Sequence, residues 1–288
     1  MRTLRTIAEV RAAVREARAA GKTVGLVPTM GAFHAGHVPL MREARANDSF
    51  VVVSLFVNPT QFGPSEDLSA YPRDEARDAA LAEAEGVDVL FAPDPAEIYP
   101  DGFATTIHID GVTAVLDGAA RGAFHFDGVA TVVAKLFGIV APDAAYFGQK
   151  DAQQILVIRR LVRDLNIDVR IVACPIVREA DGLAMSSRNV YLDPDARRQA
   201  TALNRALDAA AAVAYAGERD AVAIVAAARA VLDDAGIAPE YLELRSADDL
   251  TPVATLETEA LLAVAARVGS ARLIDNHLLH GTDTRASA

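Results

Sequence analysis

The stretch Val27-Pro28-Thr29-Met30-Gly31-Ala32-Phe33-His34-Ala35-Gly36-His37 decides the fold. The apolar run at residues 23–28 predicts a buried strand, and the residues after the stretch place apolar side chains on one face of a helix: Val38, Leu40, Met41 and Ala44. Between them lies a glycine-bracketed turn of a size that suits a phosphate group. The start of a helix carries unpaired N–H groups and a partial charge of about +0.5. We therefore expect this turn to bind an anion.

Two histidines three residues apart, His34 and His37, stand at this turn. A single histidine is more often packed or solvated than catalytic, so a structural role is the competing interpretation. The paired spacing at a strand-to-helix turn favours a functional site. The rest of the chain has to decide between them.

The composition sets limits on fold and partners. The chain has 288 residues, 52% of them hydrophobic and 23% charged, enough for one large domain or two modest ones. The first five residues are not an apolar leader and no uninterrupted apolar run approaches about 18 residues, so we expect a cytoplasmic protein. A net charge of −11 with no basic patch argues against a nucleic-acid partner. The single Cys174, in an apolar run, rules out a disulfide framework and argues against a thioester mechanism.

Strand and helix patterns alternate through the first two thirds of the chain. Strands are expected at residues 23–28, 50–57, 88–92, 144–147 and 169–177. Helices are expected at 6–20, from Val38 onward, and at 74–85, 126–140 and 151–165, with Thr6 and Asp151 as N-caps. This order predicts an α/β fold with a doubly wound, Rossmann-like parallel sheet.

The pattern changes near Asp193. Alanine-rich helical stretches at residues 194–214 and 220–234 precede apolar strands at 239–244, 260–268 and 271–274, which predicts a smaller C-terminal α+β domain. We place the domains at residues 1–188 and 189–288, and we expect the second to close over the first as a lid. The tail, residues 280–288, is predicted to be disordered.

Polar clusters follow the predicted strands. They comprise the His34–His37 pair, the amides of Asn58 and Gln61 in a proline-stiffened loop ending at Pro64, the Gly148-Gln149-Lys150-Asp151 turn with Gln154, and the Ser186-Ser187-Arg188 loop. Because ligands of open α/β sheets bind beyond the carboxyl ends of the strands, we expect one cationic pocket. The irregular segment at 93–123 is expected to wrap it. Arg121 and His125 either face an anionic substrate or, for Arg121, form a surface salt bridge.

Four of these stretches, read as motifs, identify a family. They are Pro28 to His37, Phe56-Val-Asn-Pro-Thr-Gln-Phe62, Phe147-Gly-Gln-Lys-Asp-Ala-Gln-Gln154 and Asp181-Gly-Leu-Ala-Met-Ser-Ser-Arg-Asn189. Together with Arg272-Leu-Ile-Asp-Asn276 they resemble the pantothenate synthetases over nearly the full length. The wider relatives are nucleotidyltransferases of the HxGH type and class I aminoacyl-tRNA synthetases.

The resemblance implies a homodimeric ligase that joins (R)-pantoate to β-alanine in pantothenate and coenzyme A biosynthesis, using ATP and Mg²⁺. It implies His37, His34, Lys150 and Arg188 as catalytic residues, with His37 as proton donor. It implies ATP contacts from Met30, Gly31, Ala32, Phe33, His34, Ala35, Gly36, His37, Gly148, Gln149, Lys150, Asp151, Val177, Met185, Ser186, Ser187 and Arg188. Gln61 and Gln154 resemble the pantoate ligands, Gln61 is shared with β-alanine, and we add Asn58 as a holder of pantoate. Mg²⁺ would be held mainly by the ATP phosphates.

Two positions depart from the family pattern. Ala35 replaces an acidic residue, and Gly122-Ala123-Phe124 puts three residues, rather than two, between Arg121 and His125. The second departure leaves the roles of Arg121 and His125 open.

The chemistry points to an acyl adenylate, because a carboxylate must be activated before an amine attacks and no nucleophile motif is present. A cationic cage of His34, His37, Lys150, Arg188 and Mg²⁺ would stabilise the charge on the phosphates. Three alternatives stay open: a nucleotidyltransferase acting on a phosphorylated acceptor, an aminoacyl-tRNA synthetase, and a non-catalytic ATP-binding protein.

Overall fold

The computed structural model describes residues 1–63 and 68–281, and its chain forms two compact units. The N-terminal unit comprises Met1–Thr113, Arg121–Gln149 and Gln153–Pro175, and the C-terminal unit comprises Ala114–Ala120, Lys150–Ala152 and Ile176–Ala288. The main division thus falls at Pro175, whereas the sequence suggested residue 188. Residues 176–188 group with the C-terminal unit because Leu183 is part of its apolar core. Pro64 and most of the predicted tail, residues 282–288, lie outside the described residues.

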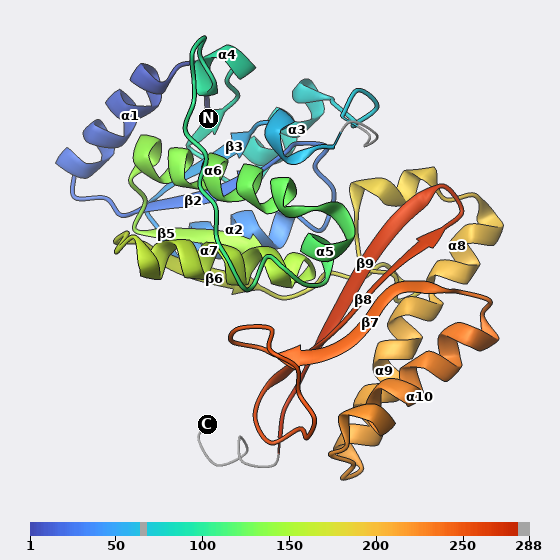
Figure 1. Ribbon diagram of the computed structural model, residues 1–288. Helices are drawn as coiled ribbons and strands as arrows, with labels where there is room; N and C mark the ends of the chain where they lie inside the picture. The colour runs from blue at the N-terminus through green and yellow to red at the C-terminus, as the bar shows by residue number, and fades with distance from the viewer. Residues whose placement is uncertain (64–67, 282–288) are drawn as a thin grey trace. The chain divides into compact units, whose positions relative to one another are not determined.

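The N-terminal unit is built on a six-stranded parallel sheet (Figure 1). Its order is β1(Arg2–Leu4), β4(Val89–Phe91), β3(Phe50–Leu55), β2(Val24–Thr29), β5(Ala144–Gly148) and β6(Arg170–Cys174). The predicted doubly wound sheet is confirmed. The prediction missed β1, whose three residues are too few for a period to show and which is held by its pairing with β4.

Alternating side chains of these strands supply two apolar cores. Val24, Leu26 and Val52 pack with α1(Ile7–Ala19), α6(Ala123–Val140) and α7(Ala152–Asp164), while Val27 and Val53 pack with α2(Val38–Asn47) and α3(Glu75–Ala84). A parallel sheet covered on both faces needs apolar residues at every strand position. This explains the continuous apolar runs that marked the strands in the sequence.

Local signals set most helix ends, with two exceptions. Thr6 caps α1 in a reciprocal capping box with Glu9, as expected. However, α6 begins at Ala123 rather than residue 126, and Asp151 does not cap α7 but ends a 3₁₀ turn, η2(Gln149–Asp151). The irregular segment 93–123 contains two short helices, α4(Pro95–Ile98) and α5(Asp117–Arg121).

Helix α6 is the one described helix long and apolar enough to cross a membrane, with a mean hydropathy of 1.5. Two thirds of it (67%) is buried inside the protein. Its apolar side chains, such as Val129, Val133 and Leu136, belong to the core beneath the sheet. The hydropathy of α6 is therefore that of a core helix.

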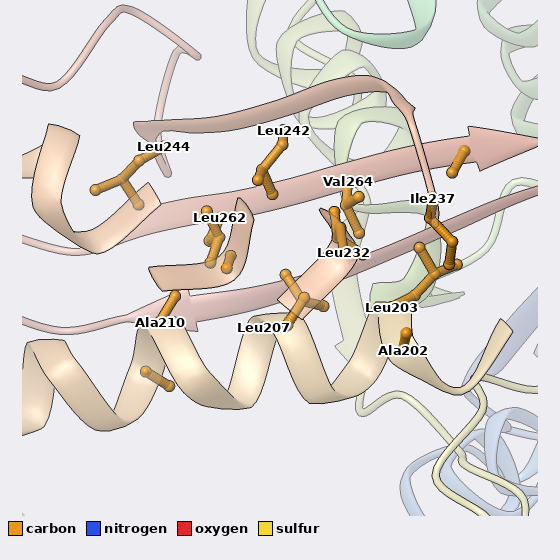
Figure 2. Close-up of a cluster of buried hydrophobic side chains, with 14 of the residues drawn as sticks. Ala202, Leu203, Leu207, Ala210, Leu232, Ile237, Leu242, Leu244, Leu262 and Val264 are labelled. Atoms are coloured by element: carbon orange, nitrogen blue, oxygen red, sulfur yellow. The ribbon is translucent and has the colours of Figure 1, made fainter. Parts of the chain in front are cut away.

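The C-terminal unit has an antiparallel sheet of β7(Pro239–Ser246), β8(Ala260–Val268) and β9(Ala271–Leu279), packed against α8(Pro194–Ala200), α9(Ala202–Tyr215) and α10(Ala221–Asp234). Figure 2 shows the core: Leu203 and Leu207 of α9 and Leu232 of α10 face Leu262 and Val264 of the sheet. The predicted α+β architecture is confirmed. Two details differ: the expected helix at 194–214 is interrupted at Thr201, and the expected strand at 271–274 runs on to Leu279.

Candidate active site

Strand order marks where a ligand binds in the N-terminal unit. From β2 the chain proceeds through β3 and β4 toward one edge, and then returns to place β5 on the other side of β2. Such a reversal opens a crevice beyond the carboxyl ends of the two central strands. The His34–His37 loop follows β2, and Gln149 follows β5, which ends at Gly148. Two predicted ATP-binding segments therefore flank this topological switch point.

The imidazoles of His34 and His37 are held by the loop itself. Their ring centroids lie 4.3 Å apart, the Gly36 N–H donates to His34 Nδ1 at 3.0 Å, and the His34 N–H donates to His37 Nδ1 at 3.3 Å. A ring nitrogen that accepts a hydrogen bond carries no proton, so each neutral imidazole carries its proton on Nε2. The loop thus sets both histidines as Nε2–H donors, the form suited to a phosphate oxygen.

A buried carboxylate that the sequence did not reveal shapes the same loop. Gly31 and Ala32 have positive φ angles of 81° and 52°, and this turn points the N–H groups of Ala32 and Phe33 at Asp78 of α3, at 2.8 and 2.7 Å. Asp78 is only 1% exposed. Burial raises the pKa of its carboxyl, and the two N–H groups act against that rise. The anion bound at this point of the turn is the protein's own Asp78.

Gln61 lies in the 3₁₀ turn η1(Pro59–Gln61), just after β3, and is held by Asn58. Asn58 Nδ2 donates to Gln61 Oε1 at 3.0 Å and to the Gly128 carbonyl at 3.1 Å, while Asn58 Oδ1 accepts from the Tyr99 hydroxyl at 2.8 Å and the Thr60 hydroxyl at 2.9 Å. Every hydrogen-bonding group of the Asn58 amide has a protein partner. Gln61 Nε2, in contrast, has none among residues 1–63 and 68–281.

His125 contacts Gln61 from the first turn of α6. Its Nδ1 lies 2.9 Å from the Gln61 carbonyl oxygen, and its Nε2 lies 2.8 Å from a guanidinium nitrogen of Arg121. The residue is buried, at 6% exposure. Arg121 therefore has His125 as one of its partners, and the surface salt bridge considered from the sequence stays a prediction.

The remaining glutamine is on α7. Gln154 is half-buried and makes no side-chain hydrogen bond within the part of the chain that the structure describes. Its neighbour Gln153 is buried and donates to the Val112 carbonyl at 2.8 Å. The two glutamines, adjacent in sequence, thus differ in their contacts: the Gln153 amide anchors the segment before α5, and the Gln154 amide does not.

In the C-terminal unit, Lys150 lies in the η2 turn and is fixed through its backbone. The Asn276 amide of β9 donates to the Lys150 carbonyl at 2.9 Å. Lys150 Nζ is 3.8 Å from Asp151 Oδ1, and its side chain is 21% exposed. A lysine that is anchored by its backbone, and whose ammonium makes a long contact of 3.8 Å with Asp151, suits an anionic ligand.

Two further residues assigned to ATP by resemblance lie side by side. The Met185 N–H donates to the Val177 carbonyl at 2.9 Å, closing a small hairpin that reverses at Gly182, where φ is 90°. Ser186 then caps the 3₁₀ helix η3(Ser187–Tyr191) by accepting from the Arg188 N–H at 3.2 Å. The Ser-Ser-Arg stretch is thus a folded turn.

Arg197 of α8 anchors this hairpin. It lies 2.8 Å from both Glu179 and Asp181, and Glu179 also accepts from Asn189 at 2.7 Å. The Arg197 guanidinium holds the pKa values of both carboxyls below their usual range. The hairpin and η3 are therefore fastened to α8 by charge.

The three polar residues of the Arg272-Leu-Ile-Asp-Asn276 stretch each hold a different segment. Arg272 pairs with Asp117 of α5 at 2.7 Å, Asp275 pairs with Arg178 at 2.6 Å, and Asn276 holds Lys150. Asp275 is almost fully buried, with 1% of its side chain exposed. These contacts explain why Ala114–Ala120 and Lys150–Ala152 group with the C-terminal unit.

The predicted site residues are thus divided between the units. His34, His37, Gln61 and Gln154 belong to the N-terminal unit, and Lys150 and Arg188 belong to the C-terminal unit. Asp78 and Arg197 were not predicted, because a single charged residue in a helical stretch gives no indication of the group that it contacts in the folded protein.

Two other features lie outside these clusters. A pocket of about 210 Å³ is lined by Thr60, Phe103, Thr105, Thr106, Phe124, Asp127, Gly128 and Thr131, none of which was predicted to bind substrate. Burial raises the pKa of the Cys174 thiol to about 11, as expected for an unreactive core cysteine.

Comparison with known proteins agrees with the motifs. The family model for pantoate-beta-alanine ligase matches residues 2–278. A pantothenate synthetase from Roseiflexus castenholzii is 57% identical over 280 residues, covering 97% of this chain and 99% of the relative. A pantothenate synthetase from Koribacter versatilis is 52% identical, covering 97% of this chain and 96% of the relative.

Solved structures give the same result. Pantothenate synthetase from Thermus thermophilus superposes with a TM-score of 0.92 at 49% identity, covering 96% of this chain and 99% of that one. The pantoate-beta-alanine ligase from Francisella tularensis, complexed with beta-gamma ATP and beta-alanine, gives 0.80 at 32% identity, covering 96% and 97%. From the matched motifs, the fold and these similarities, the chain belongs to the pantoate–β-alanine ligase family.

Proposed function

We propose that this chain joins (R)-pantoate to β-alanine, using ATP and forming pantothenate, AMP and diphosphate through a pantoyl adenylate. The observation that carries the proposal is the His34–His37 pair, fixed as Nε2–H donors at the switch point of a sheet that belongs to this family. Two such donors bind oxygens of a polyphosphate and keep binding them as negative charge builds up during reaction.

In the first step the pantoate carboxylate attacks the α-phosphorus of ATP. An oxygen–phosphorus bond forms, and the bond to diphosphate breaks. His34 and His37 donate to the phosphate oxygens, and we assign His37 the proton donated to the leaving diphosphate. Lys150 and Arg188 add positive charge, and Val177, Met185, Ser186 and Ser187 contact the nucleotide.

In the second step the β-alanine amine attacks the acyl carbon. A carbon–nitrogen bond forms, AMP leaves with the electrons of the acyl–oxygen bond, and the amine nitrogen loses one proton to solvent. We assign the amides of Gln61 and Gln154 to pantoate, with Gln61 shared with β-alanine, since both have donors that the described protein does not use. Asn58, whose amide is fully engaged, supports Gln61 and does not bind pantoate directly.

Mg²⁺ would travel on the ATP phosphates and supply charge neutralisation there. This assignment fits the donor set: residues 1–63 and 68–281 include no group of three or more His, Cys, Asp or Glu side chains arranged to hold a metal ion. Ordinary cytoplasmic location and a homodimer complete the proposal. Light scattering on purified protein measures the oligomeric state directly, and a monomer mass would contradict the homodimer.

A coupled assay for AMP tests the reaction. AMP release that requires pantoate and β-alanine together supports the ligase, and single-turnover diphosphate release with pantoate alone supports the adenylate. Diphosphate release with a phosphorylated acceptor but no β-alanine requirement would indicate a nucleotidyltransferase. ATP binding without any turnover would indicate a non-catalytic protein. Charging of transfer RNA would indicate a synthetase, against which the net charge of −11 argues.

A further inference from the structure

We propose that His125 is a positioning residue, which acts as a neutral imidazole with its proton on Nδ1 and aims the Gln61 amide at the substrate. The proposal rests on the assignment of Gln61 to pantoate, and it gives His125 a role that no motif supplied. It is carried by four features of the N-terminal unit: two contacts of His125, the clamp on Gln61, and the close approach of α6 to η1.

Two contacts of His125 indicate which of its ring nitrogens carries the proton. The Gln61 carbonyl oxygen, 2.9 Å from Nδ1, only accepts hydrogen bonds, so Nδ1 carries the proton. The Arg121 guanidinium, 2.8 Å from Nε2, only donates, so Nε2 is unprotonated. A second proton on Nε2 would point at the guanidinium and meet its positive charge. Both contacts are satisfied together only by the neutral Nδ1–H imidazole.

The side chain of Gln61 is fixed at the same time. Asn58 Nδ2 donates to Gln61 Oε1 at 3.0 Å, which sets the orientation of the Gln61 amide and turns its NH₂ group away from Asn58. His125 restrains the backbone and Asn58 restrains the side-chain oxygen. The Gln61 amide is therefore held in place before a ligand binds. Binding then requires little loss of conformational entropy from this side chain.

Gly128 explains how His125 reaches Gln61. A Cβ at Gly128 would lie 2.6 Å from the Thr60 carbonyl oxygen and 2.7 Å from the Gln61 nitrogen, closer than any side chain allows. The missing side chain lets α6 lie directly on η1. His125, three residues earlier, is on the same face of the helix and meets the Gln61 carbonyl. The three-residue spacing of His125 and Gly128 thus produces this contact.

Three variants separate positioning from simple packing. Asparagine carries an N–H close to the position of histidine Nδ1, so His125→Asn keeps the donor to Gln61, whereas His125→Phe keeps the ring volume and loses both hydrogen bonds. Gln61→Ala removes the amide that His125 is proposed to aim. KM for pantoate, KM for ATP and kcat are measured for each, and circular dichroism and thermal unfolding verify folding.

We expect His125→Phe to raise the pantoate KM about 10-fold, the value of one hydrogen bond, with the ATP KM unchanged within about 2-fold. His125→Asn should recover most of that loss. In the Gln61→Ala background, His125→Phe should have no further effect on pantoate KM, because its target is gone. Additive effects, or equal changes in all constants, would overturn the proposal.

A second measurement is independent of turnover. With ¹⁵N-histidine labelling, the His125 signal, identified by its loss in His125→Asn, should show a protonated Nδ1 and an unprotonated Nε2 at neutral pH. The Nε2–H tautomer or an imidazolium would refute the inference. Failure of the proposed reaction would appear differently, as wild-type protein that releases no pantoate-dependent AMP.

Discussion

The His34–His37 loop and the Lys150 turn follow the two central strands of one sheet, yet they are held in different ways. The loop is held by its own backbone and by Asp78, a partner 45 residues away. The turn is held by Asn276, 126 residues away on the last strand of the chain. The loop is therefore supported within the N-terminal unit, whereas the Lys150 turn is supported within the C-terminal unit.

The difference has a physical origin. Backbone N–H groups in a turn with positive φ form a fixed anion-binding hollow, which needs one buried carboxylate to complete it. A lysine must keep its ammonium available, so only its backbone serves as an anchor. We expect substitutions of the loop's support to cost stability, and substitutions of the turn's support to cost activity.

The largest effect should come from the groups that touch the phosphates. His37→Ala and Lys150→Ala should each lower the rate of adenylate formation about 100- to 1000-fold, because each removes a preorganised donor or charge. Single-turnover diphosphate release measures this rate, with the exposed Lys22→Ala as the matched control. An unchanged rate in a folded variant would remove that residue from the site.

Loss of Asp78 should show most clearly that the His34–His37 loop, unlike the Lys150 turn, contributes to the stability of the protein. Asp78→Ala leaves the Ala32 and Phe33 N–H groups without an acceptor, and at about 1–3 kcal/mol per buried group it should lower the free energy of unfolding by about 2–5 kcal/mol. Asp78→Asn keeps one acceptor and should lose less. Urea unfolding measures both, with the exposed Asp101→Ala as control.

An Asp78→Ala protein as stable as wild type would show that the loop does not depend on this carboxylate. We also expect the ATP KM to rise in Asp78→Ala, since the histidines are part of the loop. A normal ATP KM in a destabilised variant would mean that the loop re-forms when nucleotide binds.

Asn276→Ala should have the opposite profile. Removing one hydrogen bond of about 1 kcal/mol to the Lys150 carbonyl should lower kcat about 5-fold. Steady-state kinetics measure this against Asn47→Ala, an exposed asparagine on α2. A loss of stability without loss of kcat would make Asn276 a purely structural residue.

The smallest effect concerns Arg197. Because Arg197 lowers the pKa values of Glu179 and Asp181, the network adds stability at pH values above their unfolded pKa of about 4 and loses it as the pH falls through the folded values. Arg197→Gln should therefore cost about 0.5–1 kcal/mol at pH 7, the range for partly exposed pairs, and nothing in strong acid. Urea unfolding at both pH values, with and without salt, measures the difference. A cost that persists in acid would indicate lost packing rather than lost charge.

Much of the fold was readable because its signals are local. Continuous apolar runs predicted the strands, and Thr6 with Glu9 predicted the start of α1. The errors fall where tertiary contacts override local signals: β1 exists only through its pairing with β4, and α6 extends back to Ala123 where His125 meets Gln61. The candidate site follows the same rule, since the sequence offers side chains but not their partners.

By itself the sequence predicted the doubly wound parallel sheet of the N-terminal unit and the His-x-Gly-His turn between a strand and a helix, and its motifs identified the family. Apolar periodicity and turn residues suffice for the strands, the helices and the turn, because these depend on neighbours within one turn of helix or one strand, whereas the family resemblance rests on whole motifs. Only the tertiary structure decided that Asp78 occupies the turn, that Asn58 and His125 clamp Gln61, and that Asn276 holds Lys150. Each of these is a hydrogen bond between groups far apart in the chain, and such bonds form only once packing has brought the groups together.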